Sequence, residues 1–226
     1  MNPYAIPTEH QNVIIRLFKG GVDLLPQIAV SDLSILHAAV GIAGEAAELE
    51  KAVLPIRLGK PNALVDYGNI TEELGDHLFY EGALRIATGL ETLVRSDDTG
   101  DDPPPFTPPA WRAHTEDSLL EQIVGGASRR YLLCCMVSLH TVIAGDILDV
   151  AKKHVVYRKG LDLDKLRGLL LQDCWVIQQM VMLLDTSEVV LRAANLNKLV
   201  KGPNARYAQG YSDEAAQARA DKKEGE

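Results

Sequence analysis

The sequence is poor in aromatic side chains. Its 226 residues include 3 Phe, 2 Trp and 7 Tyr, which together amount to 5% of the chain. A β-sandwich or β-barrel usually carries more aromatic and β-branched residues, with frequent turn signals between its strands. The scarcity therefore argues against an all-β fold. The other proportions, 46% hydrophobic and 24% charged, are those of an ordinary globular protein.

Cysteine is also sparse. Cys134, Cys135 and Cys174 form no Cys-x-x-Cys pair and no cysteine–histidine set with the spacing of a zinc site. The chain is long enough to bury a sizeable core without disulfides or structural metals. We therefore expect three reduced, buried thiols, as is usual in a cytosolic protein.

Positive charge is the third shortage. Lys and Arg number 23 against 31 Asp and Glu, which gives a net charge of −8. A protein that binds nucleic acid by neutralising phosphates is normally basic, so we expect no nucleic-acid partner. The N-terminus lacks a basic segment followed by an apolar run, and the most apolar stretch, residues 131–145, is too short to cross a bilayer. We expect no signal peptide, no membrane span and a cytoplasmic location.

A linker rich in proline and aspartate divides the chain. Dividing the length by about 150 residues per domain gives roughly 1.5, which does not decide between one domain and two. Residues 96–111 are acidic and carry five prolines, which block helix formation. We expect residues 1–95 to form a first helical repeat and residues 112–226 a second. The charged end of the chain, residues 221–226, is expected to be disordered.

Both parts show the periodicity of helices, with apolar residues at three- and four-residue steps. The expected helices run from about 33 to the breakers Pro55, Gly59 and Pro61, from about 70 to Gly89, over about 128–155, over about 164–184 after a cap near Asp162, and over about 186–199 before Pro203. No expected element is a strand. The sequence therefore predicts an all-α fold, a helical bundle.

The two parts also resemble each other. Residues 43–51 align with residues 144–152 at an offset of 101, and residues 73–79 align with residues 170–176 at an offset of 97. The difference lies in a loop, where insertions are tolerated. We interpret this as an internal duplication. The chain is then one composite domain, an intrachain pseudo-dimer.

Two pairs of acidic residues give the sharpest chemical signal. Glu45 and Glu48, like Glu73 and Asp76, are three residues apart and lie on one helical face. Their apolar neighbours place them near the packed face, where four carboxylates would repel one another without a cation. Mg²⁺ prefers oxygen ligands, so we expect these acids to hold it. The alternative is a solvated face on which they pair with Lys51 and Arg85.

In these acids and in the segments around them, the sequence resembles the MazG-like, all-α nucleoside triphosphate pyrophosphohydrolases. The resemblance rests on Gly44-Glu-Ala-Ala-Glu48, on Asn69-Ile-Thr-Glu-Glu-Leu-Gly-Asp76 with Phe79-Tyr80, and on the C-terminal Ala194-Asn195-Leu-Asn-Lys198-Leu, Arg206-Tyr207 and Tyr211-Ser-Asp-Glu-Ala-Ala-Gln-Ala-Arg219. The C-terminal block is similar to that of phage- and bacterial-type members. If the chain is phage-encoded, the expected location is the host cytoplasm.

The resemblance implies hydrolysis of a nucleoside or deoxynucleoside triphosphate to the monophosphate and pyrophosphate. It implies Mg²⁺, for which Mn²⁺ can substitute, held by Glu45, Glu48, Glu73 and Asp76, one of which is the general base. It also implies that the nucleotide is held by Asn195, Lys198, Arg206 and Tyr207, to which we add Lys51. The expected substrate is a purine deoxynucleotide, dGTP or dATP, and the expected role is control of the nucleotide pool. A homo-oligomer of pseudo-dimers is consistent with the family.

The second repeat departs from the acidic pattern. Asp146 and Asp149 replace the two glutamates, Leu170 stands at the place of Glu73, and only Asp173 keeps its type. We expect this second acid cluster to be degenerate. The first repeat would then supply the metal site, and the second would supply packing helices and the nucleotide-holding segment.

Other readings stay open at this point. The degenerate repeat suggests a catalytically weak nucleotide-binding regulator as an alternative, and a dUTP- or dCTP-specific member of the same superfamily or a purely structural bundle are further ones. Among single residues, His37 either faces the nucleotide pocket or is a packed or half-exposed histidine, while His77 points away from the metal face. His140 and Trp175 are expected in the core, with base stacking by Trp175 as the alternative.

Overall fold

The computed structural model describes residues 8–17, 24–59, 65–93, 129–203, 205–208 and 210–218, and these ranges contain helices and no strand. The elements are α1 (Thr8–Leu17), the 3₁₀ turn η1 (Leu25–Gln27), α3 (Val30–Arg57), α4 (Tyr67–Thr88), α6 (Arg129–Val155), α7 (Leu163–Leu183), α8 (Glu188–Leu196), the π-helical turn η2 (Asn197–Lys201) and α9 (Asp213–Ala218). The expected all-α class is confirmed. The predicted linker 96–111 and the end 221–226 lie outside the described residues.

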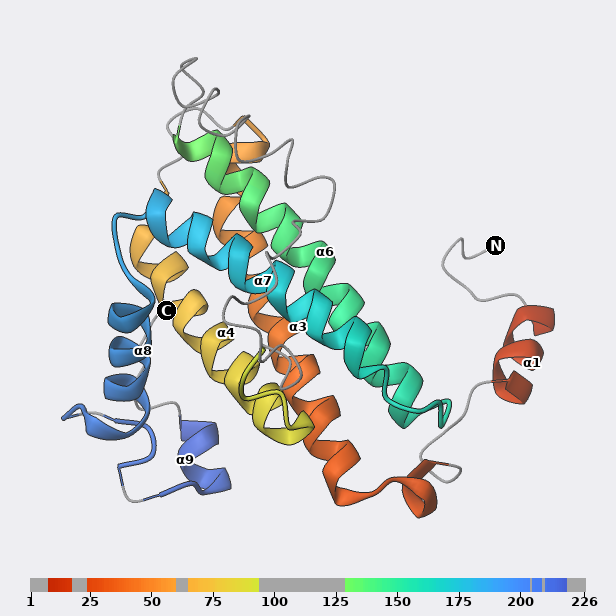
Figure 1. Ribbon diagram of the computed structural model, residues 1–226. Coiled ribbons are helices and arrows are strands. Elements are labelled where there is room, and N and C mark those ends of the chain that lie inside the picture. Colours follow the sequence, from red (N-terminus) through yellow and green to blue (C-terminus); the bar gives the residue numbers. More distant parts are fainter. Residues whose placement is uncertain are drawn as a thin grey trace, which may run out of the picture.

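The four long helices form a bundle of two antiparallel pairs (Figure 1). Helix α3 packs against both α4 and α6, and α7 packs on α6 and touches α4. Buried apolar side chains from both predicted repeats, among them Ile42, Leu74, Val137 and Leu170, belong to one hydrophobic cluster. Helix α8 packs on the outer side of α4, so the C-terminal segment lies against the first repeat.

The helix ends follow local signals that the sequence carries. The side chains of Asp66, Asp162 and Ser187 accept hydrogen bonds from backbone N–H groups in the first turns of α4, α7 and α8. Gly89 ends α4 in the left-handed conformation, with φ of 69°. Pro55 does not break α3, which continues to Arg57, because a proline disturbs the turn before it and not the turn after it.

The pattern of buried positions in α3 resembles the pattern in α6. Adding 101 to a set of buried positions in α3 gives buried positions in α6, as the alignment predicts. The pairs are Ile35 with Met136, Ala39 with His140, Ile42 with Ile143, Ala46 with Ile147, and Leu49 with Val150. The duplication itself stays a prediction.

For α4 and α7 the burial pattern corrects the predicted offset from 97 to 96. The buried Ile70, Glu73, Leu74, His77, Glu81 and Leu84 then correspond to the buried Leu166, Leu169, Leu170, Asp173, Ile177 and Met180. The same offset superposes the two aspartate caps. A shift of one residue rotates the matched face of a helix by about 100°. The alignment by residue type, which paired Asp76 with Asp173, therefore matched a residue of the cleft with a residue of the core.

Helix α6 meets the length and composition of a membrane span, contrary to the expectation that the apolar stretch is too short. Helix α7 and the segment of α8 and η2 meet these criteria only when they are counted as one span, and the two are bent by 92° relative to each other. Half of the apolar window of α6 is buried against its neighbours, and the core helix of a soluble protein has the same property. We interpret α6 as such a core helix, as the sequence predicted.

Candidate functional site

Three of the four predicted acids converge between α3 and α4. Glu45 of α3 and Glu73 and Asp76 of α4 each offer a carboxylate oxygen, and these oxygens lie within 4.8 Å of one another. We call these three residues the acid cluster. Glu48, one turn beyond Glu45, is exposed and lines the same cleft without belonging to the cluster. The helical spacing thus identified the right faces, and the packing of α3 on α4 brought them together.

Burial and neighbouring acids raise the pKa of two members of the acid cluster. Burial raises the pKa of Glu45 to about 8, and the hydrogen bond with Glu73 and the charges of the neighbouring acids add to this effect. Glu73 is only 4% exposed, and burial raises its pKa as well. A hydrogen bond between two carboxyl groups needs one proton. With a pKa raised to about 8, Glu45 keeps its proton at neutral pH in the absence of a cation.

The donor set fits a hard divalent cation. It consists of carboxylate oxygens alone, without sulfur or imidazole nitrogen, and Mg²⁺ and Mn²⁺ prefer such ligands. A bound cation would supply positive charge among these acids. Glu45, Glu73 and Asp76 are the residues that would hold it, with Glu48 at the edge of the site.

Glu45 should make the metal-free protein less stable as the pH rises. Its pKa is about 8 in the folded chain against an ordinary 4.5, so the folded state binds the proton more tightly than the unfolded state. The contribution is complete below pH 4.5 and is lost as the pH rises through 8. Because the side chain is only partly buried, we expect a loss of about 2 kcal/mol. Urea unfolding with EDTA at pH 5 and pH 9 measures it, and Glu45→Gln should flatten the slope. An increase in stability over this range would contradict the assignment.

A cleft of about 680 Å³ opens beside the acid cluster. Its walls carry aromatic side chains, although the chain has few of them. They are Phe79 and Tyr80 of α4 and Tyr207 and Tyr211 of the C-terminal segment. His37 of α3 also lines the cleft, 5.9 Å from the Tyr80 ring between ring centres. His37 is exposed, so it is not the packed histidine of the alternative, and it lies at the edge of this cleft.

The C-terminal segment contributes Arg206 and Tyr207 to this cleft, as the resemblance implies. The backbone N–H groups of Arg206 and Tyr207 donate to the carbonyls of Lys198 and Leu199 at 3.0 and 2.7 Å. This pairing folds the chain back after η2. The guanidinium of Arg206 lies 5.9 Å from the centre of the Tyr207 ring, so a cation and an aromatic face enter the cleft together.

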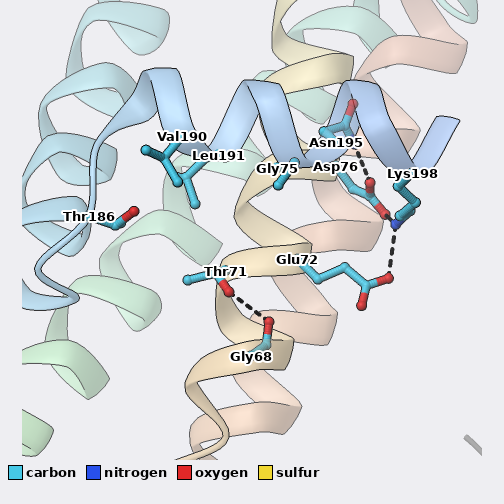
Figure 2. A pocket seen from close by; sticks show the side chains of 11 residues that line it. Gly68, Thr71, Glu72, Gly75, Asp76, Thr186, Val190, Leu191, Asn195 and Lys198 are labelled. Carbon is cyan, nitrogen blue, oxygen red and sulfur yellow. Dashed lines mark hydrogen bonds and ion pairs between the residues drawn. The ribbon is translucent and has the colours of Figure 1, made fainter. Parts of the chain in front are cut away.

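Asn195 and Lys198 lie elsewhere. They line a second pocket of about 330 Å³ between α4 and α8, and Asp76 lines both pockets. Figure 2 shows Asn195 and Lys198 reaching Asp76 from α8 and η2. Asn195 Nδ2 donates to Asp76 Oδ1 at 2.5 Å, while Lys198 Nζ donates to Asp76 Oδ2 and, at 2.9 Å, to Glu72 Oε1. These two residues therefore contact a member of the acid cluster and do not line the cleft.

A close approach of two helices makes these contacts possible. A Cβ at Gly75 would lie 3.3 Å from the Leu191 carbonyl and from Asn195 Cβ, so the absence of a side chain lets α8 lie near α4. The π-helical turn η2 follows directly. Such turns occur mostly inside α-helices and often at functional sites.

A second close approach shapes the cleft wall. A Cβ at Gly41 of α3 would overlap the ring of Tyr80, whereas a Cβ at Gly44 would meet nothing within 4 Å. We expect Gly41→Ala to lower the free energy of unfolding by about 1–3 kcal/mol, because the ring has to move. Gly44→Ala should instead raise it by up to about 1 kcal/mol through helix propensity. Chemical denaturation of both variants checks this, and equal effects would contradict it.

The remaining predicted residues do not join the site. Lys51 is exposed on α3 and lines neither pocket. In the second repeat, Asp146 is exposed and Asp149 forms an ion pair with Lys153 at 2.5 Å. Asp173 is buried away from both of them, in the core. Among the described residues, Asp146, Asp149 and Asp173 do not form an acid cluster.

No sequence pattern predicted that Asp173 joins two histidines. Its Oδ2 lies 2.8 Å from His77 Nε2 and its Oδ1 lies 2.8 Å from His140 Nδ1, and all three side chains are at most 1% exposed. The two imidazoles outweigh burial and hold the pKa of Asp173 well below its usual range. His77, His140 and the buried Trp175 are core residues, as expected. The unpredicted part is their pairing, because the partners come from three different helices.

The three cysteines are free thiols, as expected. Cys134 is buried, and Cys135 and Cys174 are half-buried. Burial raises the pKa of Cys174 to about 12, with the nearby charge of Glu81 adding to it, so this thiol is unreactive at neutral pH.

Comparisons with protein-family models, with curated proteins and with solved structures give no match. The relationship to MazG-like enzymes therefore stays a prediction from the motifs.

Proposed function

We propose that the protein hydrolyses a nucleoside or deoxynucleoside triphosphate to the monophosphate and pyrophosphate with Mg²⁺. One observation carries this proposal: the acid cluster of Glu45, Glu73 and Asp76 opens into a cleft whose other walls are aromatic and cationic. The acids suit a divalent cation, and the cation suits phosphate oxygens. The aromatic and cationic walls of the cleft suit the parts of a nucleotide that the metal does not bind.

Each group of residues in the cleft has its own role in this proposal. Glu45, Glu73 and Asp76 hold the cation, which polarises a phosphoryl group and lowers the pKa of water when bound. Glu48 lines the cleft next to the cluster, where an exposed carboxylate is suited to accept a proton from water. Arg206 lies in the same cleft, and a guanidinium neutralises phosphate charge with forked hydrogen bonds.

The aromatic side chains favour a nucleotide over a simple anion. Phe79 and Tyr211 are 52% and 73% exposed, which is a large solvent-facing area for aromatic rings in a cleft. A flat base stacked on such rings would shield them from water, and stacking contributes about 1–3 kcal/mol per base. This supports a nucleobase in the cleft without choosing among bases. Of the candidates, dGTP and dATP come first, with dUTP or dCTP as the alternative.

A panel of nucleotides tests the proposal. The protein is incubated with Mg²⁺ and each of the common NTPs and dNTPs, and the products are separated by ion-exchange chromatography. We expect a nucleoside monophosphate and pyrophosphate in equal amounts. Release of inorganic phosphate, or no turnover with any nucleotide, would contradict the proposal. EDTA should abolish the turnover.

Tyr211→Ala should weaken nucleotide binding by about tenfold, which corresponds to the lower end of measured stacking contributions. The ring is 73% exposed, so its removal should leave stability unchanged. Isothermal titration with a non-hydrolysable triphosphate analogue measures the affinity. Tyr157→Ala is the matched control, because Tyr157 is exposed at the end of α6 and lines neither pocket. Equal affinities in the two variants would show that the base does not stack on Tyr211.

A nucleotide-binding regulator of low activity is the second candidate. It is favoured by the contacts of Asp76, whose two oxygens are both occupied by Asn195 and Lys198. An acid held in this way is a weaker metal ligand. Binding of the analogue in the titration, without pyrophosphate release from any substrate in the panel, would select the regulator.

A further inference from the structure

We propose that Lys198 is a built-in counter-ion of the metal site, which a divalent cation has to displace from Asp76. This inference rests on the proposed function and concerns how strongly the site binds metal. It makes Lys198 a residue that limits metal affinity, instead of one that only contacts substrate.

The contacts of Lys198 support this role. Its ammonium group binds Asp76 Oδ2 and Glu72 Oε1, and its side chain is only 14% exposed. Asp76 is a member of the acid cluster. The ammonium therefore lies against one of the carboxylates that would bind the cation. Two cations at one carboxylate repel each other, and partial burial weakens the screening by water.

Glu72 gives the lysine a second partner. It lies one turn before Asp76 on α4, it is not a member of the acid cluster, and its side chain is 38% exposed. Lys198 bridges these two acids from η2 (Figure 2). When a metal occupies Asp76, the ammonium can stay paired with Glu72. Displacement then needs only one of the two ion pairs to break.

Asn195 has a different position in this arrangement. Its neutral amide donates to Asp76 Oδ1, the oxygen that Lys198 does not bind. An amide adds no charge that opposes a metal. Asn195 is thus a positioning residue for Asp76, and Lys198 is the competing group.

Mn²⁺ binding without nucleotide tests the inference. Isothermal titration at pH 7.5 gives the dissociation constants of the wild type and of K198M, which keeps the length of the side chain. We expect K198M to bind Mn²⁺ about tenfold more tightly, within the range usual for coupling between two sites. K198R should bind like the wild type, because it keeps the charge. K201M, in the same π-helical turn at an exposed position, is the matched control.

Glu72→Gln is a second, independent test, in which Lys198 stays in place. Without Glu72, the ammonium has only Asp76 as a partner, so E72Q should bind Mn²⁺ several-fold more weakly. The loss should be smaller in the double variant E72Q/K198M. Circular dichroism and melting curves confirm that each variant is folded.

Two results would overturn this inference without affecting the proposed function. One is an equal or weaker Mn²⁺ affinity in folded K198M, and the other is an E72Q effect that is the same with and without Lys198. A wild-type protein that binds no Mn²⁺ at all would overturn the proposed function as well, and this separates the two failures.

Discussion

Glu73→Gln should reduce pyrophosphate release by at least about 100-fold. Glu73 is 4% exposed and offers one of the three converging oxygens of the acid cluster, so its amide would leave the metal with a neutral ligand. Even residues that only support a metal ligand typically cost 10- to 100-fold when they are replaced. The measurement is the steady-state rate with the best nucleotide of the panel, over a range of Mg²⁺ concentrations.

The same substitution should leave the fold intact. Gln has the shape of Glu and removes a negative charge from a crowded site, so the metal-free variant should be at least as stable as the wild type. Asp149→Asn is the matched control, because Asp149 aligns with Glu48 at the offset of 101 and lies outside the acid cluster. A variant Glu73→Gln with more than half of the wild-type rate would show that catalysis lies elsewhere.

Asp173→Ala should lower the free energy of unfolding by about 3–5 kcal/mol, the usual cost of removing one partner from a buried ionic group. The carboxylate accepts from both His77 and His140 at 2.8 Å, and neither imidazole is exposed to water. Both rings would lose their hydrogen-bond partner, and a cavity would open in the core. Urea denaturation monitored by circular dichroism measures the loss.

Total stability of a domain is usually 5–15 kcal/mol, so Asp173→Ala could fail to fold. Asp173→Asn guards against this outcome, because its amide keeps one acceptor and the shape of the side chain. We expect Asn to fall between Asp and Ala in stability. Asp149→Ala, at a surface ion pair, should change stability by less than about 1 kcal/mol. A loss at Asp173 as small as that would mean that the buried network adds nothing.

The acid cluster illustrates which part of the site local sequence can predict. Glu45, Glu73 and Asp76 could be predicted because carboxylates three residues apart share one helical face, and their apolar neighbours favour the packed side. Glu48 follows the same rule but falls outside the cluster, because it is exposed at the edge of the cleft. The spacing fixes a face of the helix, but it does not fix how far each side chain is from its neighbour.

The contacts of Asn195 and Lys198 illustrate the other part. The resemblance implied a role in holding the nucleotide, yet the side chains bind Asp76 from a separate pocket. That contact depends on the approach of α8 to α4 at Gly75, more than a hundred residues earlier in the chain. No local pattern carries this information.

By itself, the sequence determined the helical class, the positions of most helix ends and the acidic faces of α3 and α4. These properties depend on side chains within one or two turns, where periodicity and capping act. Only the tertiary structure decided which acids converge, that Asp173 joins His77 and His140, and that the burial pattern of α7 matches that of α4 at an offset of 96 instead of 97. They depend on the rotation and separation of packed helices, which the whole core sets and no short segment of the chain encodes.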